Sequence, residues 1–152
     1  MKKLLLLTSL AFVFMEKITA QTTAADSVKR TITQFFDGMK SADTAKIRST
    51  MTDGVIFQTI ARSKSGALEV RTENVEDFLK FVVKDEKGAA DERIEFKTIE
   101  IDGILASVWT PYRFFYKGNF AHCGANSFQL VKIEDNWRIQ YIIDTRRKKG
   151  CE

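Results

Sequence analysis

The chain has 152 residues, with 24 lysines and arginines against 20 aspartates and glutamates, one histidine and two cysteines. This length fits a single domain. One histidine excludes zinc sites built from several histidines, and two cysteines exclude a four-thiolate metal site. With 44% apolar and 29% charged residues, the composition is that of a folded domain and not of a disordered chain.

The first twenty residues have the layout of a secretory signal peptide. Two lysines precede an apolar run from Leu4 to Phe14, and a more polar stretch ends at Ala20. The run is shorter than the roughly 20 residues that cross a bilayer, so we expect cleavage after Ala20 and no stable membrane anchor. The sequence predicts a signal peptide at residues 1–20, one domain at residues 21–152, and an exported protein that is periplasmic or secreted.

Cleavage also changes the charge of the protein. The segment contains Lys2, Lys3 and Lys17 against Glu16, so its loss lowers the formal net charge from +4 to +2. A nearly neutral domain does not favour nucleic acid as a partner. We interpret the remaining basic run, residues 146–149, as the solvated end of a strand.

Apolar spacing predicts three helices in the first part of the domain. Residues on one face of the first helix recur at intervals of three and four from Asp26 onward: Val28, Ile32, Phe35, Phe36 and Met39. Asp43 is the expected cap of a short second helix, and the third carries Val75, Phe78, Leu79 and Val82. Two β segments, residues 55–61 and 67–72, separate the second helix from the third.

Four long β segments follow a polar loop at residues 84–92. They are expected at residues 93–101, 104–116, 120–133 and 137–147, with a β-bulge near Lys97 and Thr98. Helices followed by a long meander indicate an α+β domain, in which the helices pack against one face of a curved antiparallel sheet.

The register of this meander predicts which side chains share a face. The turn after Tyr116 sets Phe114 opposite His122 and Thr110 opposite Asn126, and a two-residue turn at Asp135 and Asn136 sets Leu130 opposite Tyr141. The inner face then carries a large apolar group, Phe128, Leu130, Ile139, Tyr141 and Ile143, and the polar groups Thr110, Tyr112, His122, Asn126 and Tyr141. Such a mixture typically lines a ligand pocket.

The outer face carries Leu105, Trp109, Phe115, Val131, Ile133 and Ile142, which is much apolar surface for a small monomer. We therefore expect a homodimer formed through Trp109, Val131, Ile133 and Ile142.

Several C-terminal segments resemble those of a known superfamily. They are Trp109-Thr110-Pro111-Tyr112, His122-Cys123-Gly124, Phe128-Gln129-Leu130, Trp137-Arg138-Ile139 and Asp144-Thr145-Arg146. Together with the order of the elements, they resemble the nuclear transport factor 2-like superfamily, and within it the bacterial lumazine-binding and SnoaL-like group. The resemblance covers residues 26–151. It implies a cone-shaped α+β domain whose bent sheet wraps the helices around an apolar cavity, and many such domains dimerise through the outer sheet face.

The superfamily includes ketosteroid isomerases, polyketide cyclases and dehydratases, so the fold does not select a function. On the isomerase pattern, the tyrosine and the aspartate base fall on Phe35 and Thr59, neither of which can transfer the proton. The dehydratase pattern needs two histidines, and this chain has one. Both activities are therefore disfavoured.

Each candidate residue has both a functional and a structural interpretation. His122 is the one side chain whose ordinary pKa lies near neutrality, and it serves either as a proton acceptor and donor or as a hydrogen-bonded structural group. Asn126 either orients a ligand or braces the backbone, and the hydroxyls of Tyr112 and Tyr141 either bind a ligand or pack in the core. Asp144 falls on the outer face beside Arg146 or Arg113, unless a single bulge turns it inward toward His122.

Cys123 and Cys151 can form a disulfide in an oxidising compartment, provided that the chain folds back at Gly150.

The sequence leaves three functions open. The first is an exported domain that binds a small apolar or aromatic molecule without catalysis, cofactor or metal. The second is a SnoaL-like enzyme of proton transfer, cyclisation or dehydration that uses His122, aided by Asp144, as general acid and base. The third is a protein-interaction module that uses the outer sheet face.

Overall fold

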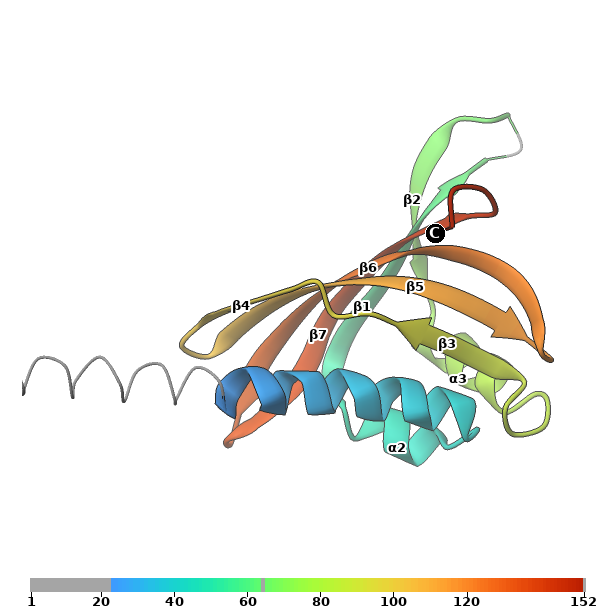
Figure 1. Cartoon of the computed structure of the whole chain (residues 1–152). Coiled ribbons are helices and arrows are strands. Elements are labelled where there is room, and N and C mark those ends of the chain that lie inside the picture. Colours follow the sequence, from blue (N-terminus) through green and yellow to red (C-terminus); the bar gives the residue numbers. More distant parts are fainter. Residues whose placement is uncertain (1–22, 64, 152) are drawn as a thin grey trace, which may run out of the picture.

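A long helix lies across the concave face of a strongly curved sheet (Figure 1). The computed structural model describes residues 23–63 and 65–151, and the predicted signal peptide lies outside them. Residues 23–40 are helical, and the predicted apolar face is buried: Val28, Ile32, Phe35, Phe36 and Met39 are each at most 8% exposed. The periodicity of this face and its burial against the sheet together explain the helix.

Two shorter helices start at side-chain caps. Helix α2 (Thr44–Arg48) begins after Asp43, whose carboxylate accepts a hydrogen bond from the Lys46 backbone N–H at 2.9 Å. Helix α3 (Val75–Val82) begins after Asn74, whose side-chain oxygen accepts from the Asp77 N–H at 3.1 Å. Both caps satisfy backbone donors that have no partner within the helix. Helix α3 lies at the end of the sheet where the N-terminal helix also ends (Figure 1).

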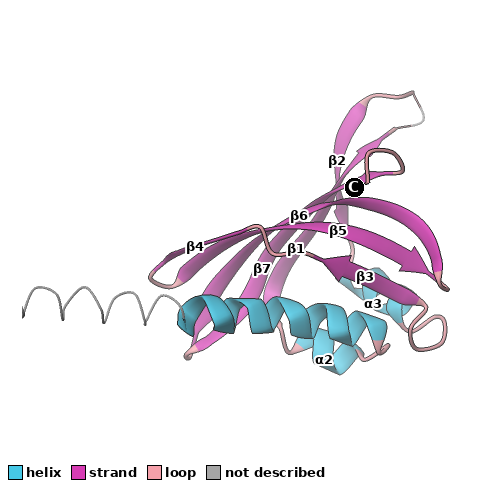
Figure 2. Ribbon diagram, in the orientation of Figure 1, coloured by secondary structure: helices cyan, strands magenta, loops and turns pink. Residues whose placement is uncertain are grey.

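Seven strands form one sheet (Figure 2): β1 (Met51–Arg62), β2 (Leu68–Glu73), β3 (Ala90–Ile94), β4 (Thr98–Asp102), β5 (Leu105–Tyr116), β6 (Asn119–Ile133) and β7 (Asn136–Arg147). Their order is β2-β1-β7-β6-β5-β3, and β4 also pairs with β5. The predicted α+β class is confirmed. The sheet is mixed and not wholly antiparallel, because β1 and β7 run parallel.

The single strand expected at residues 93–101 is in fact two strands on the same edge of β5. The ladder is interrupted opposite Pro111, whose carbonyl accepts a hydrogen bond from the Glu95 N–H at 2.9 Å. Because proline has no backbone N–H, Pro111 cannot donate a second hydrogen bond to the neighbouring strand, and continuous pairing stops there. Sequence patterning detected the irregularity as a bulge and not as a break.

The predicted pairing of β5 with β6 is correct over the middle of the hairpin. Phe114 lies opposite His122, and Thr110 lies opposite Asn126. The turn itself is shorter than expected: Lys117 and Gly118 form it with φ of 51° and 78°, as in the mirror-image turns that suit hairpins. A bulge beside Phe114 restores the predicted register.

The predicted pairing of β7 is wrong for two reasons. The turn consists of Glu134 and Asp135, with φ of 47° and 64°, and not of Asp135 and Asn136, so Ile133 pairs with Asn136. In addition, β7 contains a bulge. Leu130 pairs with Ile139 while Gln129 pairs with Tyr141, so Gln140 is an extra residue. Its side chain is held by β1: Thr52 Oγ1 donates to Gln140 Oε1 at 2.9 Å, and Gln140 Nε2 donates to the Gly54 carbonyl at 3.0 Å.

The bulge exchanges the faces of the following residues. Ile142 and Asp144 point inward and are buried, whereas Tyr141 and Ile143 point outward. Ile142 pairs with Phe57 and Phe128 in the core and is 9% exposed, so it does not belong to the predicted dimer surface. Trp109 and Ile133 do lie on the outer face and are 45% and 49% exposed.

The core is rich in aromatic rings. The ring centre of Phe35 lies 5.2 Å from that of Phe36, 6.0 Å from that of Phe57 and 5.8 Å from that of Phe78. The first two pairs meet edge to face, and the third is stacked. Phe36 in turn contacts Phe128 edge to face at 6.1 Å. These contacts join the N-terminal helix, α3 and the inner face of the sheet.

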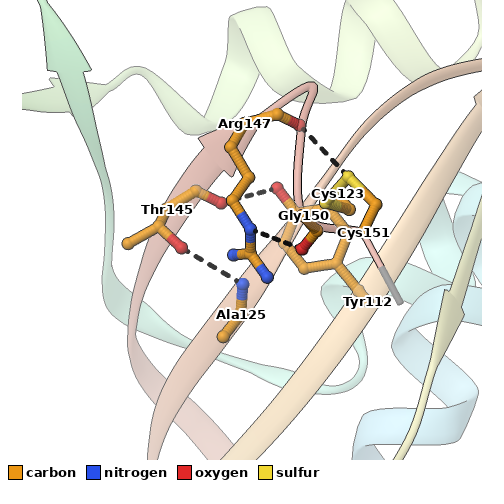
Figure 3. The surroundings of a disulfide bond; sticks show 7 residues. All are labelled: Tyr112, Cys123, Ala125, Thr145, Arg147, Gly150 and Cys151. Atoms are coloured by element: carbon orange, nitrogen blue, oxygen red, sulfur yellow. Dashed lines mark hydrogen bonds between the residues drawn. A yellow bond between two sulfur atoms is a disulfide. The ribbon is translucent and has the colours of Figure 1, made fainter.

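A disulfide between Cys123 and Cys151 ties the end of the chain to β6 (Figure 3). Their Cα atoms are 5.7 Å apart. After β7 the chain folds back through Gly150, whose φ is 63° and whose carbonyl accepts a hydrogen bond from Arg147 Nε at 3.2 Å. Within residues 23–63 and 65–151, no helix has the length and apolar character needed to cross a membrane.

Candidate functional site

A cavity of about 500 Å³ opens between α3, the end of the N-terminal helix and the inner face of the sheet. It is lined by Met39, Glu73, Asn74, Asp77, Phe78, Phe81, Glu92, Phe114, His122, Asp144 and Arg146. A recess of about 80 Å³, which shares six of these residues, is also lined by Asn126 and core aromatic residues. The volume lies within the range of small-molecule sites.

Three successive rows of paired residues on the inner face, here called rungs, bring the polar lining together. In the first rung, Glu92 of β3 lies opposite Phe114, which lies opposite His122. The second rung joins Tyr112, Gly124 and Arg146, and the third joins Thr110, Asn126, Asp144 and Thr59. Side chains on adjacent rungs of one face lie close to one another, so residues of five strands meet at one place.

Gly124 gives the middle rung its shape. A Cβ atom at this position would lie 1.7 Å from the Thr145 carbonyl oxygen and 2.8 Å from Cε1 of Tyr112. The absence of a side chain therefore lets the Tyr112 ring lie over β6. The Tyr112 hydroxyl then reaches β7, where it donates toward Asp144 Oδ2 and toward the Thr145 carbonyl, each at 3.0 Å. Figure 3 shows the contact with Thr145.

Asp144 and Arg146 form an ion pair at the wall of the cavity. Asp144 Oδ2 accepts from Arg146 Nε at 2.8 Å, and Arg146 Nη2 donates to Glu73 Oε1 at 3.0 Å. Burial alone would lower the pKa of the guanidinium, but the carboxylates of Asp144 and Glu73 raise it. Burial and the negative charges of Asp144 and Glu92 raise the pKa of the Tyr112 hydroxyl, so this group is a proton donor and not a phenolate.

Two buried polar atoms beside this ion pair have no hydrogen-bond partner among the described residues. They are Asp144 Oδ1 and Thr59 Oγ1, which belong to paired residues of β7 and β1. Asp144 is 8% exposed and Thr59 is 5% exposed. An unsatisfied buried carboxylate oxygen is costly, and atoms of this kind often mark a place where another polar group binds.

Glu92 is the second carboxylate at the inner end of the cavity. Its Oε1 accepts from Asn126 Nδ2 at 2.8 Å, and Asn126 Nδ2 also approaches Thr110 Oγ1 at 3.4 Å. Burial, reinforced by the negative charge of Asp144, raises the pKa of Glu92 from 4.5 to about 7, although Asn126 and Arg146 act in the opposite direction. Near neutral pH this group therefore exists in both its protonated and its ionised form.

His122 lies against two aromatic rings and lines the cavity. Its ring centre is 5.0 Å from that of Phe114 and 5.7 Å from that of Tyr112, which it meets edge to face. Burial lowers the pKa of His122, and the positive charges of Arg146 and Lys148 lower it further, with partial compensation by Asp144. The imidazole is therefore neutral at pH 7, with one nitrogen able to accept a proton.

The structure divides the predicted site residues into three groups. His122 and Asp144 line the cavity and Asn126 lines its recess. Thr110 and Tyr112 lie on the same face but are buried beneath the lining, where they position Asn126 and Asp144.

Tyr141 is the exception, because the bulge at Gln140 turns it to the outer face. There it donates a hydrogen bond to Gln58 Oε1 at 2.6 Å. The same bulge places Asp144 inside, which is the alternative that the sequence had left open.

Sequence reasoning did not place Glu92, Arg146 or Glu73 at the cavity. Glu92 was assigned to a loop, although β3 begins at Ala90, and its two-residue spacing from Ile94 was the available signal. Arg146 was expected to pair with Asp144 on the surface; the pair forms, but at the cavity wall. Among the described residues, no group of histidine, cysteine, aspartate and glutamate side chains has the arrangement of a metal site.

Comparison with known proteins gives structural but not sequence relatives. No family model matches the chain, and no curated protein matches it. The solved structures that it resembles include an NTF2-like protein of unknown function from Shewanella baltica, with a TM-score of 0.66 and 12% identity over 84% of this chain and 97% of that one.

A second is an NTF2-like protein of unknown function from Methylobacillus flagellatus, with a TM-score of 0.61 and 13% identity over 82% of this chain and 93% of that one. A third is a dehydratase candidate of the NTF2-like family from Streptomyces avermitilis, with a TM-score of 0.61 and 12% identity over 84% of this chain and 98% of that one. Identities this low establish the fold and leave the activity open. The chain therefore has the nuclear transport factor 2-like fold, as the resemblance of its C-terminal segments had indicated.

Proposed function

We propose that the chain is a small-molecule-binding domain whose ligand occupies the cavity between α3 and the sheet. The observation that carries this proposal is the composition of the cavity wall. Phe78, Phe81 and Phe114 offer apolar surface, and the inner end presents Glu92, Asp144 and other polar groups within about 500 Å³. Ligand sites typically combine an apolar wall with a few polar groups that fix orientation.

Native mass spectrometry of residues 21–152, after incubation with a small-molecule extract of the host, tests the proposal. We expect a discrete adduct on the wild-type chain that is lost in His122→Gln/Asn126→Ala. Tyr141→Phe is the matched control, because this tyrosine lies on the outer face and its loss should leave the adduct in place. A chain without any adduct, or an adduct that survives the double substitution, would contradict binding in this cavity.

A second candidate is acid–base catalysis within the same cavity, and it rests on Glu92 and His122. These residues flank Phe114 on one rung, so their Cα atoms lie on the order of 10 Å apart, with room for a substrate between them. A glutamate with a pKa of about 7 and a neutral imidazole can exchange protons with a substrate near neutral pH. The reaction classes that fit are proton transfer, cyclisation and dehydration.

The same extract distinguishes catalysis from binding. An enzyme should consume a component of the extract, and Glu92→Gln and His122→Gln should each abolish that consumption while the variants remain folded. An extract whose composition does not change over prolonged incubation excludes turnover of its components and favours binding alone.

We also propose export, because a disulfide is stable in an oxidising compartment and residues 1–20 have the pattern of a signal peptide. For assembly we propose a homodimer through the outer face around Trp109, Val131 and Ile133. The native mass spectrum reports the oligomer directly. If a Trp109→Ser/Ile133→Ser variant remains dimeric, the interface does not include this part of the outer face.

A further inference from the structure

We propose that the ligand of this cavity is a cation, namely a protonated amine or amidine attached to a flat apolar body, with the charged nitrogen seated between Asp144 and Glu92. This inference rests on the proposed function and adds the chemical class of the ligand. Three features of the cavity support it: the balance of charge, the unpartnered polar atoms, and the aromatic wall.

The cavity carries more negative than positive groups. Glu73, Asp77, Glu92 and Asp144 line it, and Arg146 is the one lysine or arginine among the described lining residues. His122 adds no positive charge, since its surroundings lower its pKa.

The existing cations do not neutralise the inner carboxylates. Arg146 is shared between Asp144 and Glu73. Asp77 has its own partner in Lys80 at 3.0 Å. Glu92 has a hydrogen bond from the neutral Asn126 and no ion pair among the described residues. The charge that the cavity lacks is thus a positive one, next to Glu92.

The unpartnered atoms point to the same position. Asp144 is buried to more than nine-tenths and lines both the cavity and its recess, and its Oδ1 has no hydrogen-bond donor among the described residues. The hydroxyl of Thr59, which pairs with Asp144 in the sheet, is likewise without a partner among those residues, but Thr59 lines neither the cavity nor the recess. An ammonium or amidinium group is a donor only, and it matches a site whose free atoms are carboxylate oxygens.

The aromatic side chains that line the cavity suit the remainder of such a ligand. Phe78 and Phe81 of α3 and Phe114 of β5 line the cavity. Aromatic faces attract cations as well as flat apolar groups. A carboxylate ligand would instead face four carboxylates and a guanidinium that is already paired with two of them.

Three probes of similar shape separate charge from apolar binding: 2-naphthylmethylamine, 2-naphthalenemethanol and 2-naphthoate, each titrated calorimetrically into residues 21–152 at about pH 8. Because charge-assisted hydrogen bonds are strong, we expect the amine to bind about tenfold to a hundredfold more tightly than the alcohol, and the carboxylate most weakly. Asp144→Asn and Glu92→Gln should each reduce the preference for the amine. Asp102→Asn, on β4 and outside the cavity, is the matched control and should leave it unchanged.

The outcomes distinguish the two proposals. If the three probes bind equally, the cavity is a binding site and the cationic ligand is wrong. If none binds at millimolar concentration, this inference fails, and the native mass spectrum with the host extract decides whether the proposed function fails as well. A preference for the carboxylate would also overturn the inference. The comparison among probes uses the wild-type chain, so it stays decisive even if Asp144→Asn fails to fold.

Discussion

The raised pKa of Glu92 predicts how the stability of the protein depends on pH. In the folded chain this pKa is about 7, whereas its ordinary value is 4.5. Between these values the unfolded chain has released the proton and the folded chain has retained it, so the free energy of unfolding falls as the pH rises through this window. The difference between 4.5 and about 7 corresponds to roughly 3 kcal/mol, which is an upper bound because Glu92 is not fully shielded from solvent.

Glu92→Gln removes this pH dependence while keeping the acceptor for Asn126. We expect the variant to match the wild type at about pH 4 and to be more stable by about 1–3 kcal/mol at about pH 8. Urea unfolding of both proteins across this pH range measures the difference. Glu100→Gln, an exposed position on β4, is the control and should not alter the profile.

The reasoning would be refuted if the wild type and Glu92→Gln showed parallel stability profiles. A variant that was less stable than the wild type at about pH 8 would also refute it, because the ionised carboxylate would then be favourably paired in the fold.

Three further substitutions test the geometry around the cavity. Gly124→Ala would place a Cβ 1.7 Å from the Thr145 carbonyl oxygen, so we expect a loss of at least about 3 kcal/mol, and a melting temperature close to that of the wild type would contradict it. Tyr112→Phe removes a hydroxyl that donates to Asp144 and Thr145 and should cost about 1–3 kcal/mol in urea unfolding; an unchanged midpoint would show that these bonds do not contribute. Cys123→Ser/Cys151→Ser should cost about 3.5 kcal/mol for a sequence separation of 28, and dithiothreitol should reproduce that loss in the wild type but not lower the variant further.

The parts of the fold that the sequence predicted are those that depend on local periodicity. The face of the N-terminal helix from Val28 to Met39 is buried as its spacing predicts, and Asp43 caps α2. The pairing of Thr110 with Asn126 was predicted from the turn after Tyr116. That turn is one residue shorter than expected, and the bulge beside Phe114 compensates for the difference. Each of these features is determined by residues close in sequence or by one short hairpin.

The parts that could not be predicted depend on contacts between distant segments. The bulge at Gln140 is fixed by Thr52 and Gly54 of β1, a strand that lies almost 90 residues away in sequence. It decides which of Tyr141 and Asp144 faces the cavity, and no pattern within β7 reveals it. His122 and Asn126 were placed correctly on the inner face for the opposite reason, because the β5–β6 hairpin sets their register.

The two free edges of the sheet differ in how they discourage growth by strand addition. The edge strand β2 is short and carries the charged residues Glu69, Arg71 and Glu73. On the opposite edge, the interruption facing Pro111 leaves β3 and β4 with five residues each. Charged or broken edges are poor templates for another chain. Addition of further strands at either edge, which is the route to amyloid-like growth, is thereby disfavoured.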